Sequence, residues 1–431
     1  VSQYGITWTF DKPYRVGQFV NGDWWVIGPV VIESVDPAWD GVKNGSMIDP
    51  LPEGDQVPYQ GLDSRAAGYA PTLRQVFPVT VDPAPGPRSL ISAIGRPTQA
   101  PGGAHQALSD AAVLTVLAQV PPANAFRPPW CGGGGKPLWT TGHINWGRLP
   151  GVPLPPGVTL PDDYSKVSRP WIDFGPYGQT GAEIHPENNM PPYPREMVAA
   201  FGRCSLACLV ESNPNREQWA LALVQIGIDL YEVSKSNEHG WRAYGGFGMG
   251  RKWPIMFAGM LLECPEMRSP SPLIVPGKGV NTWKFAEDGH SFIGEPTPTY
   301  PEGAPMFGWN CAENGYAYPD FFGNHDCRDP NGEFECEPFG QGEFSDIKRM
   351  LPEYGWPGAN PGGYRKLNVM VWTFEALPCL MMGGREYWNH DAFFALVDRC
   401  VAEQWGGPEY LGFYGKDRFV RLMWMAYRGN H

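Results

Sequence analysis

Hydrophobic and polar positions alternate in short segments over the first hundred residues, which is the pattern of β-strands. Asn21-Gly22-Asp23 is typical of a tight turn between two of these segments, and Pro78 restricts the last segment to a sheet edge. We therefore predict a β-rich, β-sandwich-like domain over residues 1–105. The predicted strands are Ile6–Phe10, Trp24–Ile27, Val30–Val35 and Val76–Val81.

Apolar residues recur at helical spacing in the remainder of the chain. An early run, Leu108–Val120, predicts a helix because Ser109-Asp110 can cap an Ala/Val/Leu segment. The clearest helices are Tyr193–Glu211, a helix capped by Asn213, Trp253–Leu262, Arg365–Met382, Asp391–Glu403 with Asn389 as its cap, and Arg418–Tyr427.

The short link at Asn213-Pro214 makes the helices on either side of it antiparallel neighbours. No predicted strand alternates with the helices after about residue 190, so a doubly wound sheet is excluded. Antiparallel helix pairs joined by long loops favour a mainly α fold with an (α/α) toroid or barrel over residues 106–431. A plain helical bundle is the alternative.

Composition narrows the class of protein. The net charge is −12 and no Lys/Arg cluster is present, which argues against nucleic acid as a partner. No apolar run is long enough to span a membrane. The start at Val1 fits a chain whose leader has been removed, or a trimmed one, and the sequon at Asn44 is compatible with secretion.

The nine cysteines lack the spacing of a zinc ribbon. Cys311, Cys327 and Cys336 lie in a Gly/Pro/Asn-rich loop, where a disulfide bond would close a short ring. We therefore expect a secreted, extracellular protein. Buried free thiols in a cytosolic enzyme are the alternative.

Aromatic residues are abundant, with 18 Trp, 18 Tyr and 21 Phe, and many lie in loops. Their flat faces can stack on the apolar face of a sugar ring, so this pattern favours carbohydrate binding, although loop aromatics can equally form local core. The loop tryptophans are Trp130, Trp139, Trp146, Trp171, Trp241, Trp309 and Trp356.

Three loops next to helix ends concentrate polar side chains, as expected for one rim of a toroid. They span residues 183–196, 236–252 and 300–325. The combination of His, Tyr, Asn and Arg suits β-elimination from a uronate polymer. In that reaction a cationic or amide group neutralises the C6 carboxylate, a base removes the C5 proton and an acid protonates O4. The candidate catalytic residues are His239, Tyr300, Tyr244, Asn189 and His185, and the candidate substrate-binding residues are Arg195, Arg242, Arg251, Asn188, Trp241, Trp309 and Tyr193.

Three motifs carry a resemblance to a known class of proteins. The Tyr193-Pro-Arg-Glu196 helix start, the run Gly245–Pro254 and the run Trp388–Phe394 resemble secreted polysaccharide lyases of the alginate/glucuronan-lyase type with (α/α) toroid bodies. The resemblance is partial and covers about residues 180–405. It implies lyase activity, with Asn189 as the group that neutralises the carboxylate. Where that class has Asn-Asn-His this chain has Asn188-Asn189-Met190, so the base would be His239, His185 or a tyrosine.

Other interpretations of the same residues remain. A glycoside hydrolase would need two carboxylates, and a non-catalytic protein would only hold a glycan. Arg251-Lys252 can neutralise a buried acid instead of a substrate, and His185 can bond a loop carbonyl. We expect no organic cofactor; the segment Asn324–Glu335 is acidic enough for a structural calcium ion. The candidate acids for hydrolysis are Glu183, Glu187, Asp229, Glu232 and Glu238.

Overall fold

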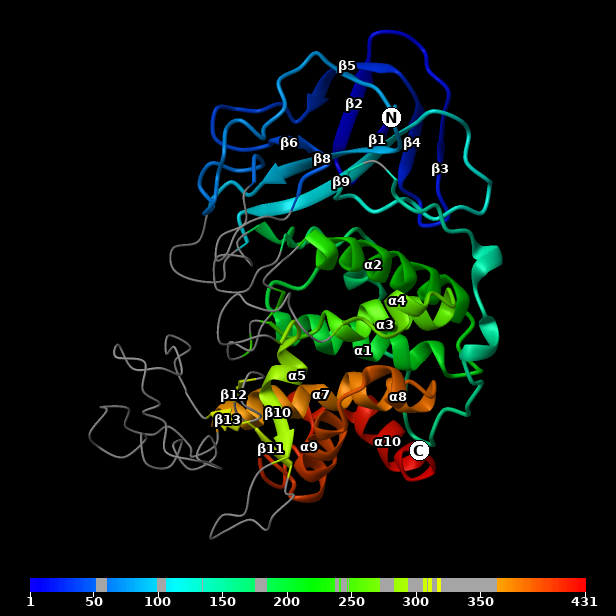
Figure 1. Cartoon of the computed structure of the whole chain (residues 1–431), viewed down its shortest axis with the longest axis vertical. Coiled ribbons are helices and arrows are strands. Elements are labelled where there is room, and N and C mark those ends of the chain that lie inside the picture. The colour runs from blue at the N-terminus through cyan, green and yellow to red at the C-terminus, as the bar shows by residue number, and fades with distance from the viewer. Residues whose placement is uncertain are drawn as a thin grey trace, which may run out of the picture.

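A β-rich region is followed by a helical region in this computed structural model of the chain (Figure 1). The structure describes residues 1–51, 60–98, 106–133, 135–174, 184–236, 240–241, 246, 248–271, 283–293, 305–307, 309–311, 316–318 and 363–431.

Two sheets build the β-rich region. The first has the strand order β1-β2-β5-β7, and the second has the order β3-β4-β9-β8-β6. All neighbouring strands are antiparallel except β4 and β9, which are parallel. The first sheet comprises β1 (Ser2–Gln3), β2 (Ile6–Phe10), β5 (Val30–Asp36) and β7 (Val79–Val81); the second comprises β3 (Val16–Gln18), β4 (Trp24–Ile27), β6 (Ser46–Ile48), β8 (Arg88–Gly95) and β9 (Leu108–Leu117).

The second sheet is buried on both faces. Along β9, Ala112 and Leu114 join the core between the two sheets, whereas Ala111 and Val113 join the larger core that fills the helical region. Successive side chains of a strand point to opposite faces, so one strand contributes to both cores. One face of the second sheet therefore packs against the first sheet, and its other face packs against the helical region.

The predicted strands are present: β2 and β4 have the expected bounds, and β5 runs one residue further than predicted. Of the predicted segment Val76–Val81 only Val79–Val81 forms a strand, β7, which follows Pro78 and lies at a sheet edge as expected. The helix predicted at Leu108–Val120 is wrong, because Leu108–Leu117 is strand β9. A strand buried on both faces shows a continuous apolar run, which periodicity cannot separate from a short buried helix. The strands of the β-rich region thus continue past residue 105.

The helices predicted after residue 190 are also confirmed. The α-helices of the described residues are α1 (Pro194–Cys208), α2 (Arg216–Ser236), α3 (Lys252–Leu261), α4 (Pro265–Arg268), α5 (Ala286–His290), α7 (Gly363–Met381), α8 (Arg385–Trp388), α9 (Asp391–Ala402) and α10 (Arg418–Tyr427). Two details differ. Helix α2 begins at Arg216, three residues after the predicted cap Asn213. His390 caps α9, and Asn389 instead ends α8 in the left-handed conformation with φ 55°. Asparagine tolerates that conformation better than most residues.

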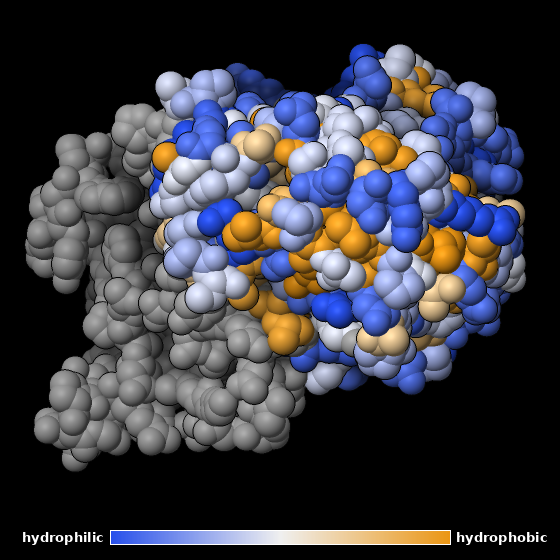
Figure 2. Space-filling model, turned by 90° about the horizontal axis from the view of Figure 1, so that it is seen from above, coloured by the Kyte–Doolittle hydropathy of each residue, from blue (hydrophilic) through white to orange (hydrophobic). Residues whose placement is uncertain are grey.

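Two small sheets interrupt the helical region. They pair β10 (Ser291–Ile293) with β11 (Pro305–Phe307), and β12 (Trp309–Cys311) with β13 (Tyr316–Tyr318). The helices that the structure describes do not form an evident closed ring, and none of them is long and apolar enough to cross a membrane. Figure 2, which looks down on the molecule from the β-rich side, shows apolar residues interrupted by hydrophilic ones on this face.

No disulfide bond joins the cysteines whose side chains are described: Cys131, Cys204, Cys208, Cys264, Cys379 and Cys400. Burial raises the pKa of Cys204 and of Cys379, so these thiols stay protonated and act as apolar core atoms. The predicted bridge among Cys311, Cys327 and Cys336 concerns side chains outside the described residues.

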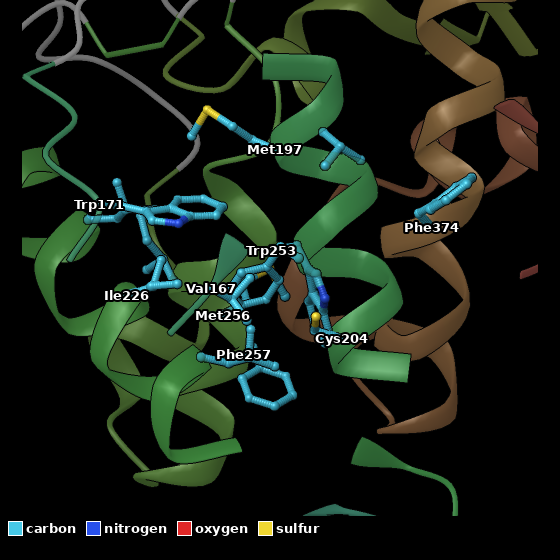
Figure 3. Packing of buried hydrophobic residues seen from close by; sticks show 14 of the residues in the cluster. Val167, Trp171, Met197, Cys204, Ile226, Trp253, Met256, Phe257 and Phe374 are labelled. Carbon is cyan, nitrogen blue, oxygen red and sulfur yellow. The ribbon is translucent and has the colours of Figure 1, made fainter. Parts of the chain in front are cut away.

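Aromatic, aliphatic and sulfur-containing side chains pack together in the core of the helical region (Figure 3). Phe257 of α3 lies edge-on to Phe201 of α1, with ring centroids 5.8 Å apart, and Trp253 donates a hydrogen bond from Nε1 to Ser205 Oγ at 3.0 Å. Glycines allow the helices to approach: a Cβ atom on Gly202 of α1 would lie 2.4 Å from the carbonyl oxygen of Phe374 on α7. Gly227 of α2 meets the carbonyl of Pro254 in the same way.

The contact at Gly202 predicts a clear effect of a small substitution. We expect Gly202→Ala to lower the free energy of unfolding by about 1–3 kcal/mol, because α1 and α7 must separate to admit the methyl group. This outcome is opposite to the gain that alanine brings in an unconstrained helix. Urea denaturation measures it, with Gly429→Ala as the matched control because no atom lies within 4 Å of a Cβ there. An unchanged midpoint for Gly202→Ala would contradict the close packing of these helices.

Candidate functional site

A buried histidine is held by an acid and an arginine. His185 Nε2 lies 3.2 Å from Oδ1 of Asp173, and Arg251 Nε donates to Oδ2 of Asp173 at 2.8 Å. The three side chains are almost fully buried. His185 Nδ1 has no hydrogen-bond partner. A carboxylate that accepts from one ring nitrogen fixes the tautomer and leaves the other nitrogen as an acceptor, which is the arrangement of an oriented general base.

Asp173 remains an anion in this arrangement. Burial alone would raise its pKa, but the charge of Arg251 and the hydrogen bond from His185 outweigh burial, and the pKa lies well below its usual value. Arg251 also donates from Nη1 to the carbonyl of Met249 at 2.7 Å. Arg251 therefore neutralises a buried acid, which was the alternative to its predicted substrate-binding role.

Arg251 belongs to a segment that we call the glycine-rich turn, comprising Gly246 and Gly248–Lys252 in the described residues. A Cβ atom on Gly250, which has φ 87°, would lie 2.9 Å from Val198 and 3.2 Å from the carbonyl of Pro194. The turn thus sits against the start of α1. This contact joins two of the three loops that the sequence predicted to share a site.

Tyr193 and Asn368 meet at the other end of the glycine-rich turn. A Cβ atom on Gly246 would lie 2.6 Å from Tyr193 Oη and 3.2 Å from Asn368 Oδ1, so both side chains face the same glycine. Asn368, near the start of α7, is 2 % exposed and its Nδ2 has no hydrogen-bond partner. The phenol of Tyr193 and the amide of Asn368, which has an unused donor, therefore both lie against Gly246.

Arg195, predicted to bind substrate, lies beside Tyr193. Its guanidinium carbon is 5.1 Å from the ring centroids of both Tyr193 and Tyr414. Its Nε lies 3.6 Å from Oε1 of Glu196 and makes no hydrogen bond. A guanidinium held between two aromatic rings keeps its planar edge available for a carboxylate.

A cluster of buried charges adjoins the turn on the side of α5 and α7. Lys252 Nζ donates to both oxygens of Asp288 at 2.7 Å. The backbone N–H of Gly250 donates to Oε1 of Glu287 at 2.5 Å. Burial raises the pKa of Glu287 to about 7, and burial together with the charge of Glu287 raises the pKa of Glu375 well above its usual value.

Other predicted site residues are engaged elsewhere. Asn189 is fully buried: its Nδ2 donates to the carbonyls of Ala111 and Pro170 at 2.8 and 2.9 Å, and its Oδ1 accepts from the N–H of Ala111. Its amide is used to join backbone segments, so we leave it out of the proposed site. Asn188 is exposed and donates to Asp110.

Trp241 is a core aromatic in the structure. It is 0 % exposed, stacks on Phe285 with centroids 6.1 Å apart and lies under the Arg251 guanidinium at 5.9 Å. No face of this ring is open to a sugar, which corrects its predicted role as a stacking platform. The Trp241 ring instead packs against the guanidinium of Arg251, which belongs to the glycine-rich turn.

Several predicted residues lie outside the described part of the structure. They are His239, Arg242, Tyr244, Tyr300, the side chain of Trp309, and the acidic segment Asn324–Glu335.

Of the acids considered for hydrolysis, the described ones form ion pairs: Glu187 with Arg96, Asp229 with Arg127 and Glu232 with Lys235. Glu183 and Glu238 are outside the described residues. The acids that the structure brings together are different ones. Sequence reasoning missed Asp173, Glu287, Asp288, Asn368 and Glu375.

One of these residues had a visible signal. Glu375 is the single acid in the apolar run from Val369 to Met382, and an acid inside a buried helix requires a partner or a function. The sequence around Asp173 and Asn368 shows no comparable pattern. Their proposed roles depend on contacts with His185 and Gly246, which lie in other segments of the chain.

Within the described residues, no group of three or more His, Cys, Asp or Glu side chains is arranged to hold a metal ion. Comparison of the chain with protein-family models, with curated proteins and with solved structures found no match. The resemblance to polysaccharide lyases therefore stays a prediction from the motifs.

Proposed function

We propose that this chain is a secreted polysaccharide lyase that cleaves an acidic, uronate-containing glycan by β-elimination. The observation that carries the proposal is the buried His185, oriented by Asp173 through one ring nitrogen and unpartnered at the other. The (α/α) toroid implied by the motifs belongs to the same proposal. His239, Tyr244 and Tyr300 stay predicted members of the site.

The proposed roles follow from the donors and acceptors around the glycine-rich turn. His185 Nδ1 is the base that takes the C5 proton, and Asp173 and Arg251 are positioning residues that hold its ring. Asn368 Nδ2, a donor without a partner, hydrogen-bonds the C6 carboxylate, and the Arg195 guanidinium adds positive charge at the start of α1. Tyr193 binds the same sugar at Gly246.

The reaction class is tested by incubating the purified chain with alginate, glucuronan, pectate and a neutral glucan. A lyase forms an unsaturated uronate, so we expect a new ultraviolet absorption band together with new reducing ends on one of the acidic glycans. New reducing ends without the band indicate hydrolysis and contradict the proposal. Binding without either product indicates a glycan-binding protein and also contradicts it.

The base is tested by His185→Asn, which keeps a hydrogen-bond donor for Asp173 but removes the proton acceptor. We expect the rate of band formation to fall at least about 100-fold, the usual contribution of a general base. The matched control is His143→Asn, because His143 is exposed and bonds only within its own turn at Thr140. A thermal melt of each variant shows that the fold is intact. Full turnover in a folded His185→Asn protein rules out this base.

A further inference from the structure

A pair of buried carboxyls near the proposed site has no counter-ion of its own. We call Glu287 of α5 and Glu375 of α7 the carboxyl pair; their exposed fractions are 0 % and 1 %. Neither oxygen of Glu375 has a hydrogen-bond partner, and neither has Oε2 of Glu287. Because an unsatisfied buried polar atom costs about 1–3 kcal/mol, three such atoms together require an explanation.

The surrounding charges do not neutralise the pair. The charge of Lys252 acts on both carboxyls, but its Nζ is held by both oxygens of Asp288 and by the carbonyl of Trp388 at 2.8 Å. Trp388 Nε1 donates a further hydrogen bond to Asp288 at 3.1 Å. A further titratable group that interacts with Glu375, the thiol of Cys379, is kept neutral because burial raises its pKa.

The pair therefore holds at least one proton at neutral pH. Burial and the second negative charge both disfavour full ionisation, as in other sites where two carboxyls share a proton. A carboxylic acid that keeps its proton near pH 7 is well suited to donate it during a reaction, because the best general acids have a pKa near the working pH.

One hydrogen bond and one position on α7 connect the pair to the proposed site. Glu287 Oε1 accepts a hydrogen bond from the N–H of Gly250 in the glycine-rich turn. Asn368 lies two helical turns before Glu375 on α7, on the same face, and its buried Nδ2 is also unpartnered. Unused donors and acceptors thus gather where α5, α7 and the turn meet, which points to a polar ligand at this place.

We propose that the carboxyl pair is the general acid of the β-elimination and delivers its proton to O4 of the leaving sugar. This inference rests on the proposed lyase function. The C5 proton passes to His185 Nδ1, and the electrons of the C5–H bond form the C4=C5 double bond. The C4–O4 bond breaks, and its electron pair takes the proton from the pair. The pair then carries one more negative charge and His185 one proton, and exchange with water restores both.

The experiment measures kcat and KM against pH for the full chain, on whichever acidic glycan gives the ultraviolet band. The wild-type kcat is expected to fall on the alkaline side with an apparent pKa near 7, well below that of a tyrosine acid. Glu375→Gln and Glu287→Gln should each lower kcat at least about 100-fold while KM changes only a few-fold. The control is Glu409→Gln, because Glu409 is exposed and pairs only with Lys416.

The outcomes separate the inference from the function on which it rests. A normal rate and an unchanged alkaline limb in both variants overturn the inference, while the band in the wild type still supports a lyase. No band on any acidic glycan overturns both proposals. Reducing ends without the band, lost in Glu375→Gln, assign the pair to hydrolysis and again overturn both. Two separate variants are used so that a folding defect in one leaves the other to decide.

Discussion

Replacing Arg127 with alanine is expected to lower the free energy of unfolding by about 3–5 kcal/mol, because two buried carboxylates lose their cation. Arg127 is 0 % exposed. Its Nε donates to Asp23 at 2.6 Å, in the turn between β3 and β4, and its Nη1 donates to Asp229 of α2 at 3.0 Å. The side chain thus ties the β-rich region to the helical region. Even with this cation present, burial raises the pKa of Asp229 to about 6.

Urea denaturation at neutral pH measures this loss. The control is Arg385→Ala, since Arg385 forms an exposed pair with Asp391 and should change stability by less than about 1 kcal/mol. The destabilisation should shrink at about pH 4, where Asp229 is protonated and no longer needs a cation. A loss below about 1 kcal/mol at neutral pH would show that the bridge is not needed for stability.

The carboxyl pair predicts that the wild-type protein loses stability as the pH rises from about 5 to about 8. The folded state holds the Glu287 proton up to a pKa of about 7, whereas the unfolded chain releases it near 4.5. Between these values the unfolded state loses protons that the folded state retains, so stability falls by about 1.4 kcal/mol per pH unit, or about 3 kcal/mol in total. Above about pH 8 this contribution is fully lost.

Glu375→Gln should flatten this dependence, because an amide does not titrate and so removes the contribution of a carboxyl whose pKa is raised by burial and by the charge of Glu287. We expect the variant to be more stable than the wild type at about pH 8 and similar at about pH 5. The measurement is the urea midpoint across this pH range, with Glu409→Gln as the exposed control. Parallel curves for wild type and Glu375→Gln would mean that Glu375 titrates alike in the folded and the unfolded state.

The elements that could be predicted from the sequence are those in which local pattern and burial agree. Strand Ile6–Phe10 and helix Arg418–Tyr427 have one buried and one exposed face, and their periodicity located both ends. Strand β9 was taken for a helix because both of its faces are buried. The cap of α9 was placed one residue early because Asn389 serves the preceding helix.

The site was predictable only in part, for a physical reason. His185, Tyr193 and Arg195 were found because polar residues gather just before a helix start, where backbone N–H groups favour anions. Glu375 had a local signal as an acid within an apolar run, but Asp173 and Glu287 come from distant segments and gain their surroundings through burial. Burial of this kind depends on how helices pack, which no local pattern of residues records.

The parallel pairing of β4 with β9 has a consequence for how the protein is made. Trp24 pairs with Leu114 and Ile27 with Leu117, although these residues are far apart in the chain. During synthesis β3 and β4 leave the ribosome long before β9 has been made. The apolar side chains of β4 therefore stay exposed until β9 can pair with it. Pairings between distant segments slow folding and leave apolar surface exposed in aggregation-prone intermediates. We therefore expect a nascent chain that ends before Leu117 to depend on chaperones.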